Sequence, residues 1–85
     1  MIARQTILVG DEQADVVKAV SVHLEEAGLQ VMIARTGAEA LEAARRFLPA
    51  LIVLEVTMPV IPGTVVLRTL KGDPVTAEIP VVMIS

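Results

Sequence analysis

Short apolar runs alternate along the chain with segments in which apolar residues recur every three or four positions. Runs this short and this rich in Val and Ile predict strands, at residues 6–10, 31–34, 50–54 and 79–84. The periodic segments between them predict helices, at residues 13–27, 36–48 and 64–71. This alternation is typical of an α/β fold with a parallel sheet, arranged here as a single domain over residues 1–85.

The predicted helices begin and end at residues suited to those roles. Thr36, with Glu39 three residues later, has the spacing of a capping box. Gly28 supplies a left-handed stop after the first helix, and Pro49 marks the end of the second. On the first helix we expect these apolar residues to face the core: Val16, Val17, Val20, Leu24 and Ala27. On the second we expect the same of Ala40, Leu41, Ala44, Phe47 and Leu48.

Acidic residues follow two of the predicted strands. Asp11 and Glu12 come directly after the first strand, and Glu55 comes directly after the third. Ligands of open parallel sheets bind outside the carboxyl ends of the strands. If the first and third strands are neighbours, the three carboxylates share one crevice.

The amino-acid composition excludes several kinds of site and partner. No cysteine is present, which excludes disulfides and thiolate metal sites. The net charge is -3, and the only basic pair is Arg45 and Arg46, so nucleic acid is not an expected partner. No apolar run approaches the roughly 20 residues of a membrane helix, and no signal peptide is apparent. We therefore expect a cytoplasmic protein without a membrane partner. We also expect that the protein is no enzyme, because no nucleophile or second base accompanies the acidic pair.

Several segments together resemble the receiver domain of two-component response regulators. The matching segments follow in order, at residues 7–12, 27–28, 36–41, 49–59 and 73–85. The resemblance implies a flavodoxin-like parallel sheet with strand order 2-1-3-4. It also implies a truncated domain, because the chain stops before the family's fourth helix, fifth strand and fifth helix.

The resemblance also implies roles for individual residues. Asp11 and Glu12 correspond to the family's magnesium-binding acidic pair, and Glu55 stands at the phosphoacceptor position. Thr57 stands where a backbone carbonyl reaches the metal, and Ser85 matches the switch hydroxyl that hydrogen-bonds the phosphoryl group. Such oxygen ligands, Glu55 included, suit Mg²⁺, for which we expect weak binding.

Departures from the family pattern make this an atypical receiver, or pseudo-receiver. Glu55 replaces an aspartate, and its extra methylene displaces the nucleophilic oxygen. A displacement near 1 Å can lower the rate on the order of 10²-fold. Pro62 replaces the aspartate that usually precedes Gly63. Neither Lys18 nor Lys71 stands at the position of the family's phosphate-binding lysine. We therefore expect inefficient phosphorylation.

Three interpretations of the module stay open. Glu55 could hold a fixed negative charge in place of phosphorylation, with a histidine kinase or an output protein as partner. The module could instead be a weak true phosphoacceptor. It could also be an interaction or dimerisation unit that keeps only the scaffold, with Glu55 simply solvated at a strand end.

The fourth predicted strand raises a separate expectation. Without a fifth strand beside it, the segment from Val81 to Ile84 presents an apolar, unpaired edge, which is a template for association. We therefore expect a homodimer or a domain swap through this strand, or a partner chain that completes the sheet. The alternative is that the chain is part of a longer protein.

Overall fold

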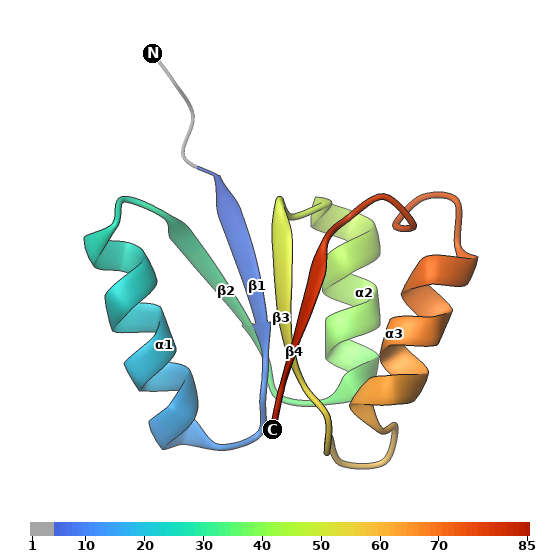
Figure 1. Cartoon of the computed structure of the whole chain (residues 1–85), viewed down its shortest axis with the longest axis horizontal. Helices are drawn as coiled ribbons and strands as arrows, with labels where there is room; N and C mark the ends of the chain where they lie inside the picture. Colours follow the sequence, from blue (N-terminus) through green and yellow to red (C-terminus); the bar gives the residue numbers. More distant parts are fainter. Residues whose placement is uncertain (1–4) are drawn as a thin grey trace.

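The computed structural model describes residues 5–85, in which strands and helices alternate along the chain (Figure 1). The strands are β1 (Thr6–Gly10), β2 (Gln30–Ala34), β3 (Leu51–Glu55) and β4 (Val81–Ile84). The helices are α1 (Ala14–Glu26), α2 (Gly37–Phe47) and α3 (Gly63–Gly72). The predicted α/β class is confirmed. The first four residues of the predicted domain lie outside the described part of the chain.

The four strands form one parallel sheet in the order β2-β1-β3-β4, which confirms the expected order. Gly10 is opposite Leu54 across the β1–β3 pair, and Glu55 is opposite Ile84 across the β3–β4 pair. All strands point toward the lower edge in Figure 1. The residues that follow β1 and β4 therefore lie at the same end of the sheet as Glu55, the carboxyl end of the strands.

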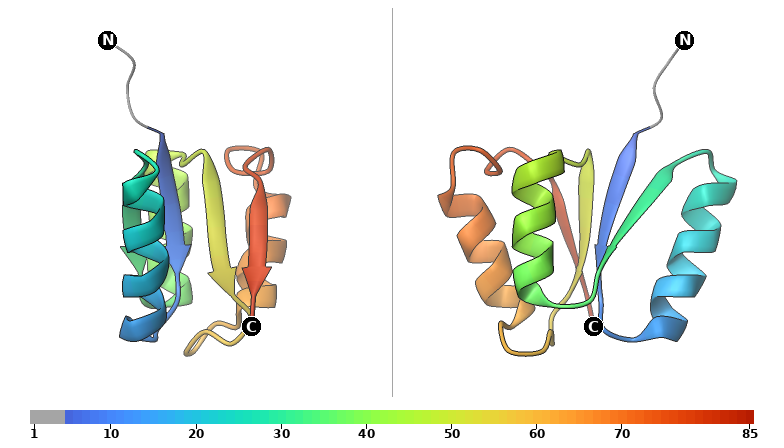
Figure 2. Two further views of the ribbon diagram at one scale, coloured as in Figure 1. Left: turned by 60° about the vertical axis from the view of Figure 1, so that its left-hand side comes forward. Right: turned by 180° about the vertical axis from the view of Figure 1, so that it is seen from behind.

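Helices cover both faces of the sheet, α1 on one face and α2 with α3 on the other (Figure 2). The larger core lies on the α2–α3 face, where Ile52 and Leu54 are fully buried, and a smaller cluster around Val9 and Val17 lies under α1. Val53 packs against this second cluster. Because side chains alternate between faces along a strand, β3 must be apolar at successive positions to meet both cores.

Side-chain capping fixes where α2 begins. The Thr36 hydroxyl accepts a hydrogen bond from Glu39 N at 3.1 Å, and Glu39 Oε1 accepts one from Arg35 N at 3.2 Å. The predicted capping box is confirmed, with the returning bond made to the residue before Thr36. At the end of α1, Gly28 has φ +87°, as expected for a left-handed stop.

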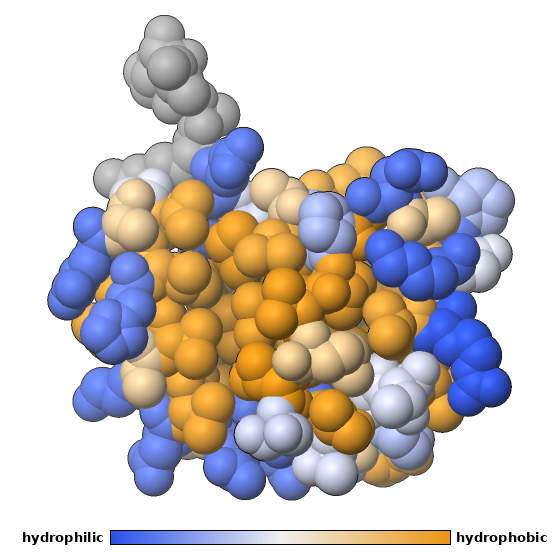
Figure 3. All heavy atoms as spheres, viewed as in Figure 1, coloured by the Kyte–Doolittle hydropathy of each residue, from blue (hydrophilic) through white to orange (hydrophobic). Residues whose placement is uncertain are grey.

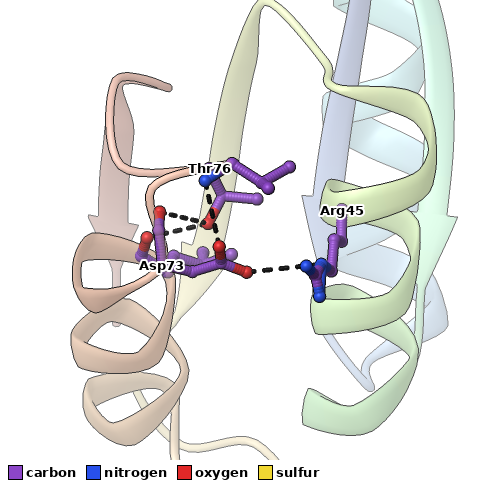
Figure 4. A network of polar contacts seen from close by, with 5 residues as sticks. Arg45, Asp73 and Thr76 are labelled. Atoms are coloured by element: carbon purple, nitrogen blue, oxygen red, sulfur yellow. Dashed lines mark hydrogen bonds and ion pairs between the residues drawn. The ribbon is translucent and has the colours of Figure 1, made fainter.

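A polar network ties the end of α3 to its neighbours (Figure 4). The buried Thr76 hydroxyl donates to the Leu70 carbonyl at 2.7 Å, and Asp73 pairs with Arg45 of α2 at 3.5 Å. Lys71 Nζ donates to two carbonyls of the segment before β4, at 3.0 and 2.7 Å. The exposed ion pair contributes little, so the buried hydroxyl and the lysine bonds hold α3 and the start of β4 together.

Three expected core positions are wrong. Phe47 and Leu48 are each 54% exposed, and Ala27 is exposed beyond the end of α1. The reason at the end of α2 is that Leu48 takes a left-handed conformation, with φ 49°, which ends the helix and turns the chain away. Pro49 is buried in their place.

The fourth strand is shorter than expected and begins at Val81. The amide of Ile79 donates to the Thr76 carbonyl within a turn, and Pro80 has no amide proton to contribute to a ladder. Among residues 5–85, no helix combines the length and the apolar character needed to cross a bilayer.

Candidate functional site

Two hydrogen bonds fix Asp11 in the loop between the end of β1 and the start of α1. Its amide donates to the Ala34 carbonyl at 3.0 Å, and its Oδ1 accepts from the amide of Gln13 at 2.9 Å. The side chain is only 2% exposed. A short carboxylate that accepts from the amide two residues on makes an Asx turn, so the local sequence aims this carboxyl inward.

Glu55 is also buried, at 8% exposure, although it is the last residue of β3. Its Oε1 accepts a hydrogen bond from the Thr57 hydroxyl at 3.2 Å. In the ionised side chain, Oε2 is buried and accepts no hydrogen bond within residues 5–85. The interpretation that Glu55 is simply solvated at a strand end is therefore wrong. An unsatisfied buried acceptor costs about 1–3 kcal/mol, so this oxygen is the natural contact for a ligand.

The two buried carboxyls face each other, which raises the pKa of Glu55 above its ordinary value. Hydrogen bonding to the Asp11 carboxyl is the main cause, because only a protonated Glu55 can donate to it. Burial and the negative charge of Asp11 act in the same direction, and Glu12 adds a smaller effect. The Thr57 hydroxyl opposes the shift by stabilising the carboxylate. Within residues 5–85, no positively charged group is among the causes of the shift.

The remaining predicted site residues lie at the rim. Glu12 is exposed and reaches Glu55 only through its charge, and Ser85 is exposed just after β4, whose Ile84 pairs with Glu55. Thr57 was assigned through its backbone carbonyl, whereas the structure shows its hydroxyl bonded to Glu55. Within the described residues, no three acidic or histidine side chains gather as a ready metal group. The structure thus brings together Asp11, Glu55 and Thr57.

These residues fit a hard divalent cation. Two buried carboxyls lie close together, one of their oxygens accepts no hydrogen bond in the described chain, and the hydrogen bond with Asp11, burial and the negative charge of Asp11 raise the pKa of Glu55. Mg²⁺ binds through one or two carboxylates and keeps several of its waters, so a third carboxylate is not required. Asp11 and Glu55 would hold the ion directly, with Glu12 at the rim.

Gly63 sets the position of the Glu55 backbone. The Gly63 amide donates to the Val56 carbonyl at 2.8 Å, which brings the first residue of α3 against the end of β3. A methyl group at Gly63 would collide with the Glu55 carbonyl oxygen. With Pro59 and Pro62 close by, the sequence predicts only a turn at Gly63, and the steric role carries no local sequence signal.

Val60 is a second feature of this loop that sequence reasoning missed. It is 97% exposed and has φ 68°. For a β-branched residue the left-handed region is a strained conformation, at a cost of about 1–2 kcal/mol. The loop between β3 and α3 therefore holds backbone strain a few residues from Glu55.

A family model described as "Response regulator receiver domain" matches residues 7–85. Among curated proteins, the response regulator PleD of Caulobacter vibrioides is 42% identical over 79 residues, covering 93% of this chain and 17% of PleD. The DNA-binding dual master transcriptional regulator RpaA of Synechocystis sp. is 35% identical, covering 93% of this chain and 33% of RpaA. The chain thus spans a third or less of the length of these relatives.

Solved structures share the fold closely. The N-terminal domain of a response regulator receiver protein from Methanoculleus marisnigri JR1 matches with a TM-score of 0.92 and 35% identity, over 98% of this chain and 68% of that one. The receiver domain of the sensor histidine kinase PA1611 from Pseudomonas aeruginosa PAO1, solved with a magnesium ion in its active site cleft, matches with a TM-score of 0.93. It is 20% identical, over 98% of this chain and 68% of that one, and shows the common fold.

Replacing Gly63 by alanine should destabilise the protein by about 3 kcal/mol, because the added methyl displaces the end of β3. Gly72→Ala is the matched control. Gly72 is the last residue of the same helix, and a methyl there meets no atom within 4 Å. We expect the control to be neutral or up to about 0.5 kcal/mol more stable. Urea unfolding measures both, and equal stabilities of the two variants would contradict the steric role of Gly63.

Glu55→Gln should remove a pH dependence of stability. The folded state binds the Glu55 proton more tightly than the unfolded chain, so the unfolding free energy falls as pH rises from the ordinary pKa of 4.5 through the raised pKa. The glutamine variant lacks this fall and should be the more stable protein at neutral pH, with the difference vanishing in acid. Unfolding curves across this range measure it, with the exposed Glu78→Gln as control. Parallel curves for wild type and Glu55→Gln would refute the shift.

Proposed function

Because this chain belongs to the response regulator receiver domain family, we propose that it is a pseudo-receiver of two-component signal transduction, in which Glu55 keeps a carboxylate at the acceptor position and accepts phosphate poorly. The observation that carries the proposal is the burial of Glu55 against Asp11. The burial limits how a phosphate donor can reach the carboxylate. The longer side chain changes where the carboxylate oxygens lie.

Burial works against attack by Glu55. A nucleophilic carboxylate must reach the phosphorus of its donor in line with the departing oxygen. Here Oε1 is bonded to the Thr57 hydroxyl, and Oε2 is buried beside the Asp11 carboxyl. The additional methylene places the carboxyl farther from the backbone than that of an aspartate at the same position. Both effects lower the rate of phosphoryl transfer, and misplacement near 1 Å alone can cost on the order of 10²-fold.

When it is ionised, the same carboxylate supplies a negative charge without phosphorylation. An ionised Glu55 carries one negative charge, whereas a phosphorylated side chain carries about 1.5 to 2 together with further acceptor oxygens. The imitation is therefore partial. Bound Mg²⁺ would supply positive charge that neutralises the acidic pair. Asp11 and Glu55 would hold it, and the Thr57 hydroxyl orients the Glu55 carboxyl.

The partners follow from this role and stay predictions. A module that holds a fixed charge communicates through its surface to an output protein, or binds a histidine kinase without receiving its phosphate. The cytoplasmic location of the module stays a prediction as well.

Acetyl phosphate with Mg²⁺ tests the proposal directly, with intact mass as the readout. We expect wild type to stay unlabelled and Glu55→Asp to gain a phosphoryl group, because the shorter side chain restores the geometry of attack. Glu55→Gln, which has no nucleophile there, is the matched control and should stay unlabelled.

The other outcomes separate the alternatives. Labelling of wild type would overturn the proposal in favour of a true, weak phosphoacceptor. If wild type and Glu55→Asp both stay unlabelled, the longer side chain is not the cause, and the module is better described as an interaction unit.

We further propose that β4 pairs with the β4 strand of a second copy. Within residues 5–85, β4 pairs only with β3, and Val82 is 49% exposed at the free edge. Figure 3 is seen from the same side as Figure 1. It shows apolar atoms over the middle of the molecule, where Figure 1 draws β4. An unpaired apolar edge is a template for association, and natural proteins usually protect such an edge with charge.

The absence of cysteine makes this association easy to test. Under mild oxidation Val82→Cys should form a disulfide-linked dimer, because two neighbouring β4 strands bring the thiols together. Val75→Cys is the control, since Val75 is similarly exposed at 46% but lies outside the sheet. Non-reducing electrophoresis measures the dimer fraction. Equal crosslinking of the two variants would count against pairing through β4.

A further inference from the structure

The opposite edge of the sheet carries an apolar groove with acidic walls. The groove lies between β2 and α2, which contact each other. It has a volume of about 200 Å³ and is lined by Ile33, Glu39, Glu42, Ala43 and Phe47. We call this surface the α2 groove.

Phe47 makes the α2 groove unusual for a chain of this composition. It is the only aromatic residue of the protein, yet it is 54% exposed and lies outside the core. Ile33, at the free edge of β2, is also exposed. Exposed apolar residues gathered in one patch with a polar rim mark interaction sites more often than scattered ones do.

Charge along α2 is segregated by sign. Glu39 and Glu42 stand in its first half, and Arg46 stands in its last turn. The Arg46 guanidinium lies over the Phe47 ring, 5.2 Å from its centroid. Neither Glu42 nor Arg46 forms an ion pair within residues 5–85, whereas Arg45 is paired with Asp73 on the other side of the helix. The groove thus presents both signs of charge beside its apolar centre.

We propose that the α2 groove is a contact surface for a second copy of this chain, with the two α2 helices antiparallel across a twofold axis near Ala43. In this arrangement the acidic half of each helix lies beside Arg46 of the other copy, and the two Phe47 side chains cover the apolar centre. A twofold interface must be complementary to itself, and a helix with opposite charges at its two ends meets that condition when reversed. The small Ala43 side chain at the crossing allows the helices to approach closely.

A partner peptide carrying only basic charge would match the surface less well. Arg46 would repel it, and half of the charge pattern would stay unused. The α2 groove is also remote from β4, since β2 and β4 are the two edges of the sheet. The two contacts can therefore be tested separately, and neither depends on phosphorylation.

Sedimentation analysis of the Val82→Lys protein tests the proposal, because a lysine at β4 suppresses pairing at that edge. We expect a concentration-dependent dimer over the micromolar to millimolar range. In this background Phe47→Ser should weaken the dimer at least about tenfold, through loss of the apolar centre. Because Phe47 contributes little to the core, circular dichroism should show the variant folded.

Charge reversal supplies the discriminating control. Glu42→Arg and Arg46→Glu should each weaken the dimer about tenfold, because each places like charges across the twofold axis. The double variant, which keeps the net charge of the protein, should recover the wild-type dissociation constant. A monomer at all concentrations in the Val82→Lys background would overturn the proposal. So would a dimer that Phe47→Ser leaves unchanged, or a double variant no better than the single ones.

Discussion

Two carboxyl groups that face each other in a buried place are the constraint around which this molecule is arranged. Asp11 and Glu55 come from neighbouring parallel strands, and their meeting follows from the register that sets Gly10 opposite Leu54. Like charges so placed cannot both stay ionised at low cost unless a proton or a cation joins them. The pKa shift of Glu55, the fit to Mg²⁺ and the proposal of poor phosphate acceptance all rest on this single arrangement.

The scaffold around this pair leaves little freedom to relieve it. Gly63 brings the start of α3 against the Glu55 carbonyl, and Thr57 holds one carboxylate oxygen. At the other end of α3, Lys71 bonds to the carbonyls that lead into β4. The helix α3 is therefore joined to the sheet at both ends, and its first residue lies against the backbone of the acidic pair.

Much of this arrangement could be read from the sequence, for identifiable reasons. Strand and helix positions followed from apolar periodicity, the strand order followed from family resemblance, and the meeting of Asp11 with Glu55 followed from both. The exposure of Phe47 did not follow, because periodicity alone does not say where a helix ends, and Leu48 turned the chain one residue later. The burial of Glu55 was also unreadable, since a carboxylate at a strand end has no local signature that separates a solvated position from an enclosed one.

The strained Val60 has a consequence for how such a module could respond. The left-handed backbone of Val60 is strained, which raises the free energy of the loop. Its side chain is almost fully exposed, so no buried packing holds it in this conformation. Rotation of Val60 out of the left-handed region would release part of this free energy without disturbing the sheet. Local rearrangement therefore costs less free energy in this loop, close to the carboxylates, than in the packed layers on either side.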